Sequence, residues 1–187
     1  MPTRALVISF MDFSAACRGG KCSSRITLAP QSRFLGSLPV FHCFGITIGL
    51  WYPMIGGYDM VTYPSPLEAK RLGALIKQYG ISLVVTTPTF LRGFMKRCEP
   101  DTFKTVRYLI VGAEKLPDEL SAAFREKFGT VPCEGYGLTE ASPVISSNLP
   151  SCHKYGTTGK PFPSVSCAIM DEAGNTLSPG EVGEITI

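Results

Sequence analysis

Between residues 65 and 137 the apolar residues alternate between helical spacing and short continuous runs. Three stretches have apolar residues at a helical period and begin with a proline beside a residue that favours a helix start. In the first, SPLEAKRLGALIKQYG, we expect Ser65 as the N-cap, Glu68 as the second half of a capping box and Gly80 as the stop. The three predicted helices are 65–80, the segment that begins at Thr87, and 117–129.

Short apolar runs rich in β-branched residues separate these helices and predict strands. The runs are ISLVV (81–85), VRYLIV (106–111) and VPCEGYG (131–137). Strands and helices that alternate at this spacing form βαβ units, so the pattern predicts an α/β fold with a mostly parallel sheet flanked by helices. Ligands of such sheets bind at the carboxyl ends of the strands. The loops TTPTF, GAEKL and GYGLTE are expected at that edge.

Residues 34–58 contain no Asp, Glu, Lys or Arg and are long enough to span a bilayer. Two prolines and five glycines interrupt the run, which favours a buried strand followed by a core helix. We expect Phe44 and Trp51 in that core. The N-terminal MPTRALVISFMDFSAAC is loosely like a secretory or lipoprotein signal, but Asp12 interrupts its apolar part.

Composition narrows the class of protein. The net charge is only +3, and no run of five Lys or Arg residues is present, so nucleic acid is not an expected partner. The seven cysteines are odd in number, form no CxxC pair and accompany only two histidines. This pattern disfavours a zinc site and a disulfide framework and suits a reducing, cytoplasmic location.

The stretch EGYGLTE (134–140) has residues suited to a nucleotide with its metal. Gly135 and Gly137 allow close approach of the backbone to a ligand, and the Tyr136 ring can stack on a flat heterocycle. The Thr139 hydroxyl can donate to a phosphate oxygen, and the Glu140 carboxylate is a hard ligand suited to Mg²⁺. An ordinary turn, in which these two side chains cap the next segment, explains the stretch equally well.

Four motifs occur in order: LPVFHCFG, VGAEKLP, EGYGLTE and GTTGKPFP. Together they resemble the adenylate-forming (AMP-binding) superfamily of acyl-CoA synthetases, luciferases and peptide-synthetase adenylation domains. The sequence around these motifs is most similar to the acyl-CoA and acyl-[acyl carrier protein] synthetase branch. The resemblance covers residues 30 to 187.

The resemblance implies a role for each matching residue. Thr139 and Glu140 are the implied catalytic residues, with Thr139 on the α-phosphate of ATP or AMP and Glu140 as the Mg²⁺ ligand. His42, in the Phe-His pair, is the implied contact to the acyl substrate, although a core histidine is the plainer interpretation. The residues implied to bind the adenine and ribose come from two loops: Gly112, Ala113 and Glu114, and Glu134, Gly135, Tyr136 and Gly137.

The implied reaction is ATP-dependent activation of a fatty acid or other carboxylic acid. The acyl-adenylate forms with release of pyrophosphate, and the acyl group then passes to the thiol of CoA or of acyl carrier protein. The lipid substrate leaves association with a membrane surface open. The implied domains are a leader of uncertain origin (1–33), an α/β nucleotide-binding lobe (34–150) and the truncated beginning of a β-barrel subdomain (151–187).

The sequence departs from the family pattern in three places. Residues 1–33 contain no Ser/Thr/Gly-rich phosphate loop, and GTTGKP (156–161) matches a downstream Gly-Pro motif instead. The ribose-binding Asp and the adenylation Lys of the family would lie beyond Ile187, while Asp171 is expected in a hairpin turn. We therefore expect an internal fragment, inactive alone. The alternatives are a non-catalytic nucleotide-binding remnant and a membrane-embedded protein.

Overall fold

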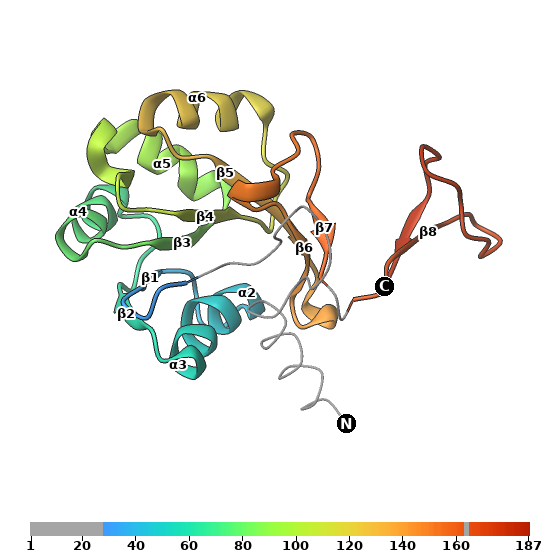
Figure 1. Ribbon diagram of the computed structural model, residues 1–187, viewed down its shortest axis with the longest axis horizontal. Helices are drawn as coiled ribbons and strands as arrows, with labels where there is room; N and C mark the ends of the chain where they lie inside the picture. Colours follow the sequence, from blue (N-terminus) through green and yellow to red (C-terminus); the bar gives the residue numbers. More distant parts are fainter. Residues whose placement is uncertain (1–27, 163–164) are drawn as a thin grey trace.

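The computed structural model describes residues 28–162 and 165–187. Its main sheet has seven strands, shown in Figure 1. Their spatial order is β2 (Asp59–Thr62), β1 (Arg33–Gly36), β3 (Leu83–Thr86), β4 (Tyr108–Val111), β5 (Pro132–Gly137), β6 (Val144–Ser147) and β7 (Lys160–Pro161). The first five strands in this order pair in parallel, and β6 and β7 add antiparallel pairs. The mostly parallel α/β sheet is therefore confirmed.

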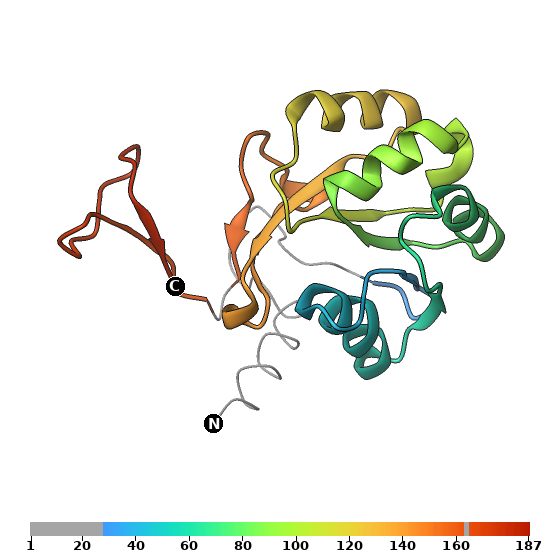
Figure 2. The ribbon, with the colours of Figure 1, turned by 180° about the vertical axis from the view of Figure 1, so that it is seen from behind.

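Helices cover both faces of this sheet (Figures 1 and 2). One face carries α4 (Ala69–Tyr79), α5 (Pro88–Arg97) and α6 (Asp118–Phe128), together with a 3₁₀ turn at Pro100–Phe103. The other face carries α2 (Cys43–Ile46), a π-helical segment (Thr47–Trp51) and α3 (Tyr52–Gly56), which run on from one another. Two further 3₁₀ turns follow β5 and β6, at Thr139–Ala141 and Pro150–Cys152.

Strand residues alternate between two hydrophobic clusters because successive side chains point to opposite faces of a sheet. Val84 and Leu109 pack with α4, α5 and α6. Leu83, Val85 and Ile110 pack on the other face, with Ile48 and Tyr52 among their neighbours. Burying a side chain of this size stabilises the fold by about 1.5–3 kcal/mol. The two clusters fix the sheet between its helical layers and hold its carboxyl edge in place.

The helix starts show which cap signals work. As predicted, α5 begins beside Thr87, whose Oγ1 accepts the Phe90 N–H at 3.4 Å, and α6 begins directly after Pro117. The predicted start at Ser65 is wrong, since α4 begins at Ala69. The Tyr63 hydroxyl donates to the Glu68 carboxylate at 2.7 Å. Glu68 stands at the N-cap with no side-chain cap bond, and the capping box does not form.

The uncharged run 34–58 forms most of β1 and then the continuous helical segments from α2 to α3, which end at a turn with Gly57. Within the described ranges, no helix is both long and apolar enough to cross a membrane. Phe44 packs against the cluster on this face, as expected. Trp51 is 42% exposed, so its expected place in the core is wrong.

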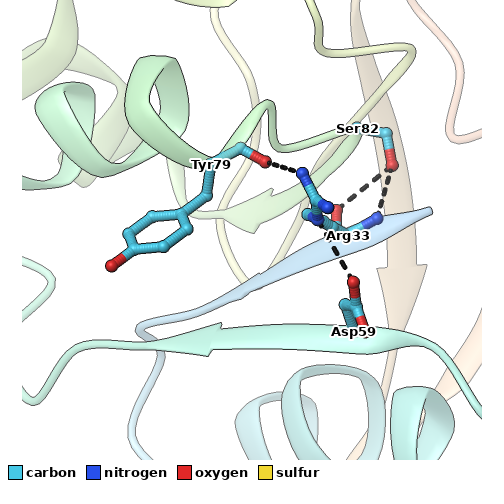
Figure 3. Close-up of polar contacts among 4 residues, drawn as sticks. All are labelled: Arg33, Asp59, Tyr79 and Ser82. Carbon is cyan, nitrogen blue, oxygen red and sulfur yellow. Dashed lines mark hydrogen bonds and ion pairs between the residues drawn. The ribbon is translucent and has the colours of Figure 1, made fainter. Parts of the chain in front are cut away.

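Arg33 links β1, β2, α4 and the residue that precedes β3 at the amino edge of the sheet (Figure 3). Its guanidinium donates to Asp59 Oδ2 at 3.2 Å and to the Tyr79 carbonyl oxygen at 2.8 Å. The Arg33 main-chain N–H donates to Ser82 Oγ at 3.0 Å, and this hydroxyl donates back to the Arg33 carbonyl oxygen at 3.2 Å. Arg33, at the end of the expected leader, is thus the first residue of β1. Residues 1–27 of that leader lie outside the described part.

Strands β8 (Ala168–Met170) and β9 (Glu184–Thr186) form a separate antiparallel pair. The turn after β8 is held by Asp171, whose Oδ1 accepts the N–H groups of Ala173 and Asn175 at 3.0 and 2.8 Å. The expectation that Asp171 lies in a hairpin turn is confirmed. The strands described in this region do not close into a barrel.

Candidate functional site

A cavity of about 240 Å³ opens at the carboxyl edge of the parallel strands. It lies between the first residues of α2, the end of β4 and the loop that joins β5 to β6. This is the edge at which open α/β sheets bind ligands. The lining residues are His42, Cys43, Phe44, Ile48, Ile110, Gly112, Ala113, Gly135, Tyr136, Gly137, Leu138, Thr139, Glu140, Pro143 and Val144.

The cavity brings together residues from three motifs that are far apart in the sequence. Of the residues predicted for the site, all but Glu114 and Glu134 line it. His42 comes from the start of α2, Gly112 and Ala113 follow β4, and the others lie between Gly135 and Glu140. One cavity thus brings together residues that the sequence predicted at the strand ends, and their roles stay a prediction.

The two glutamates outside the lining bond to neighbouring elements. Glu134 Oε1 accepts the main-chain N–H of Leu116 at 2.9 Å, which ties the loop after β4 to β5. Glu114 Oε2 accepts the hydroxyl proton of Thr89 at 2.8 Å, which ties the same loop to the start of α5. The carboxylates hold the loop from both sides, and that loop presents Gly112 and Ala113 to the cavity.

Backbone geometry explains the small residues of the site. Ala113 has a φ of 67°, in the left-handed region, so the chain turns sharply as it leaves β4. A Cβ at Gly137 would collide with the main-chain carbonyl of Pro143, where the β5–β6 pairing shifts register. Side chains are therefore excluded at Gly137, and the backbone can approach a ligand there.

His42 has a defined neutral tautomer. It is the N-cap of α2, and its Nδ1 accepts the Phe44 N–H at 3.2 Å. A ring nitrogen that accepts a hydrogen bond carries no proton, so the proton of the neutral ring is on Nε2. The side chain is exposed at the rim of the cavity. The structure therefore does not bear out a buried core histidine.

Cys43 and the apolar lining were not predicted as site residues. Cys43 Sγ lies 3.2 Å from Thr139 Oγ1, in contact with a residue that the motif did identify. Phe44, Ile48, Ile110 and Val144 make the inner wall apolar. Apolar residues in strands and helices are predicted to lie in the hydrophobic core, and these four residues do pack there. Nothing in the sequence around them indicated that they would also line a cavity. Their place beside the cavity depends on long-range packing.

Charge in the cavity is sparse. Among the described residues that line the cavity, the exposed Glu140 is the only carboxylate, and none is a Lys or Arg. Among the residues whose structure is described, no group of three His, Cys, Asp or Glu side chains could hold a metal ion. A metal at Glu140 would therefore take its remaining oxygens from water or from a bound ligand.

The GTTGKP stretch lies outside this cavity. Gly159 has a φ of 80° and packs against the main chain of Ser147, and Lys160 begins β7, which pairs with β6. The side-chain amide of Asn148 donates to the carbonyl oxygens of Lys154 and Thr157, which shapes the preceding loop. This stretch is a tight turn into an edge strand.

Comparison with known sequences identifies the family. The family model of the AMP-binding enzymes matches residues 4–187. The long-chain-fatty-acid–CoA ligase of Bacillus subtilis is 32% identical over 161 residues, which cover 83% of this chain and 28% of that protein. The probable 4-coumarate–CoA ligase 3 of Dictyostelium discoideum is 34% identical over 166 residues, covering 86% and 30%. The chain thus spans less than a third of the length of these two relatives.

Solved structures agree on the fold. Apo MatB from Rhodopseudomonas palustris superposes with a TM-score of 0.83 at 21% identity, covering 97% of this chain and 34% of that one. The unliganded O-succinylbenzoate coenzyme A synthetase (MenE) of Bacillus subtilis gives a TM-score of 0.82 at 24% identity, covering 97% and 36%. With the sheet topology, the cavity and the family match together, the chain belongs to the family of AMP-binding enzymes.

Proposed function

We propose that the cavity at the carboxyl edge of the sheet binds the adenylate part of ATP, as part of an acyl-activating ligase. The observation that carries this proposal is the convergence of residues from three sequence motifs on one cavity. The substrates would be ATP and a carboxylic acid, with CoA or a carrier protein as the thiol acceptor. We also propose residues 34–150 as the nucleotide-binding lobe and 151–187 as the beginning of a barrel subdomain.

The comparisons support this proposal. The fatty-acid and 4-coumarate relatives are named as CoA ligases, and a Mycobacterium tuberculosis relative, 26% identical over 89% of this chain, is named p-hydroxybenzoic acid–AMP ligase FadD22. MatB has been crystallised with ATP, and MenE with ATP and a magnesium ion. The names of the three ligases share adenylate or thioester chemistry on a carboxylic acid. Because the acids differ, the substrate class we propose is a carboxylic acid.

Adenine and ribose would contact the two loops that meet at the cavity. The Tyr136 ring, on β5, offers a flat face for a heterocycle. The sharp turn at Ala113 exposes main-chain groups at the end of β4, and the missing side chain at Gly137 leaves its backbone accessible. Glu134 and Glu114, which we expected to touch the nucleotide, would act on it through the loop that they hold.

Thr139 and Glu140 would face the phosphates from the rim of the cavity. Mg²⁺ commonly binds to one or two carboxylates and completes its shell with phosphate oxygens and water, so a lone carboxylate suits it. When bound, the ion would neutralise the charge on the phosphoryl oxygens. The Thr139 hydroxyl would donate to an α-phosphate oxygen. Both side chains are exposed and accessible to a ligand.

The reaction itself follows from the chemistry of a carboxylate, which is a poor acyl donor. Its oxygen attacks the α-phosphorus of ATP, the bond to pyrophosphate breaks, and a mixed anhydride forms. A thiolate then attacks the acyl carbon and displaces AMP. His42, with its proton on Nε2, would donate to an oxygen of the acid substrate and hold it in line. Groups fixed in place before the reaction stabilise the charge that develops on the phosphoryl oxygens.

The lack of cationic side chains in the described lining favours a second candidate, a nucleotide-binding module without catalysis. A triphosphate needs cations to bind tightly, and no Lys or Arg of the described residues lines this cavity. We therefore propose that the 187-residue chain on its own binds AMP weakly, binds ATP no more tightly, and turns over too slowly to detect. For the acyl-activating ligase we also propose a cytoplasmic location, with a lipid substrate as its link to membrane surfaces.

Glu140→Gln tests the proposed metal site. Without Mg²⁺ the Glu140 carboxylate repels the triphosphate, so ATP should bind the wild-type chain about tenfold more weakly than with Mg²⁺, a difference of about 1.4 kcal/mol. The variant should lose this dependence on Mg²⁺ and keep its affinity for AMP. Ligand-observed NMR measures both affinities. Glu172→Gln, in the exposed turn after β8, is the control. An unchanged Mg²⁺ dependence in Glu140→Gln would exclude Glu140 as the ligand.

A further inference from the structure

Cys43 and Thr139 form a contact between two motifs that are 96 residues apart. Cys43 is the first residue of α2, and Thr139 begins the 3₁₀ turn after β5. Their Sγ and Oγ1 atoms are 3.2 Å apart, and both side chains line the cavity. In the described part of the chain, the Thr139 side chain has no other hydrogen-bond partner. The orientation of this hydroxyl therefore depends on Cys43.

Either Cys43 Sγ or Thr139 Oγ1 could donate in this contact, and the neighbouring histidine favours the thiol as the donor. His42 Nδ1 lies 3.9 Å from Cys43 Sγ and could in principle accept the thiol proton. Its single lone pair already accepts the Phe44 N–H at 3.2 Å, however. A neutral imidazole has only one acceptor nitrogen, so no second acceptor is left on the ring. Thr139 Oγ1, at 3.2 Å, is then the nearer acceptor for the thiol proton.

A thiol that donates to Thr139 leaves the Thr139 proton free. A hydroxyl has one proton and two lone pairs, so an oxygen that accepts from the thiol keeps its own proton. The O–H is then available to a ligand in the cavity. We propose that Cys43 is a positioning residue for Thr139: it holds the hydroxyl so that its proton points to the phosphate of a bound adenylate. This inference rests on the proposed function, because it takes the ligand to be an adenylate.

The expected effect is small and specific to the phosphate. Thiols are weak donors, and one hydrogen bond of ordinary strength corresponds to a change in affinity of about three- to tenfold. Cys43 would contact the phosphate only through Thr139. Its loss should therefore weaken the binding of AMP and leave the binding of adenosine, which has no phosphate, unchanged. A general disturbance of the cavity would weaken both.

The experiment compares AMP and adenosine on the purified 187-residue chain by ligand-observed NMR. Cys43→Ala should weaken AMP about three- to fivefold and leave adenosine unchanged. Cys43→Ser keeps a proton donor and should restore most of the affinity. Thr139→Val should reduce the AMP affinity at least as much, and adding Cys43→Ala to it should cause no further loss, because coupled residues are not additive. Cys167→Ala, at an exposed cysteine, is the matched control.

The outcomes separate this inference from the proposed function. If the wild-type chain prefers AMP to adenosine and Cys43→Ala binds AMP equally well, only the positioning role is wrong. An equal loss of AMP and adenosine in both Cys43 variants would also overturn it, since that result indicates a structural role. If the wild-type chain binds neither compound, the proposed function fails and this inference fails with it.

Discussion

The Glu134 carboxylate accepts a 2.9 Å hydrogen bond from the main-chain N–H of Leu116, and so joins β5 to the loop that follows β4. The Leu116 side chain is buried, with 4% of its surface exposed. The family resemblance implied that Glu134 touches the adenine. In the structure its acceptor satisfies a main-chain donor, which fixes the loop that presents Gly112 and Ala113 to the cavity.

Glu134→Ala should therefore lower the stability of the chain. It leaves the Leu116 N–H without a partner, and losing a hydrogen bond to a charged acceptor costs about 1–3 kcal/mol. Urea unfolding would measure the free energy. Glu114→Ala is the matched control, because its carboxylate and the Thr89 hydroxyl are both exposed, and the expected cost is within about 0.5 kcal/mol. Equal costs for the two variants would refute the special role of Glu134.

Gly159 and Gly156 form a second matched pair. Both have a positive φ, 80° and 69°, but a Cβ at Gly159 would collide with the main chain of Ser147, whereas nothing lies near one at Gly156. Gly156→Ala should cost about 1 kcal/mol for the left-handed backbone alone. Gly159→Ala should cost about 2 kcal/mol more from the clash. Thermal or urea unfolding measures both, and similar costs would mean that β7 does not pack on β6 as described.

Cys133 should be chemically inert in the folded chain. It is fully buried, and burial, with a smaller contribution from nearby Cys152, raises the pKa of its thiol to about 12. The reactive species is the thiolate, so iodoacetamide at pH 8.5 should modify exposed Cys167 and spare Cys133 until the chain unfolds. Peptide mass mapping gives the rate at each cysteine. Equal rates at Cys133 with and without urea would contradict its burial.

The same pKa shift makes stability depend on pH. The folded state keeps the Cys133 thiol protonated, while an unfolded thiol ionises near pH 8.5. This contribution to stability is therefore fully present below about pH 8.5 and declines as the pH rises from there towards 12. Cys133→Ala should show a smaller decline between pH 8 and 10 than the wild type.

The sheet and most helix boundaries follow from local sequence. Thr87 and Pro117 are the N-cap residues of α5 and α6. These helix starts were predictable because a cap residue acts on main-chain groups only a few positions further along the chain. The start of α4 could not be predicted in this way. The Glu68 carboxylate accepts a hydrogen bond from the Tyr63 hydroxyl and does not complete a capping box. The sequence does not show which of these two contacts forms.

The residues of the site likewise divide into those that the sequence predicted and those that it did not. The order of the motifs predicted that Gly112 and Thr139 lie at one edge of the sheet, because the carboxyl ends of parallel strands lie together. In the structure both line one cavity, together with His42. The motifs did not show that Glu114 and Glu134 lie outside the cavity lining. Their hydrogen-bond partners are in α5 and in the loop after β4, and these contacts depend on the folded structure. The contact of Cys43 with Thr139 depends on how α2 packs beside the β5–β6 loop, which no local pattern encodes.

Titration of the purified chain with AMP, followed by residue-resolved ¹H–¹⁵N NMR, tests the central claim most directly. The account predicts a dissociation constant of about 0.1 mM or weaker, with the largest shift changes at Gly112, Tyr136 and Thr139. Tyr136→Ala should weaken binding further, and ATP should bind no more tightly than AMP. Shift changes confined to residues outside the cavity, or no change at saturating AMP, would contradict the claim that this cavity is a nucleotide site.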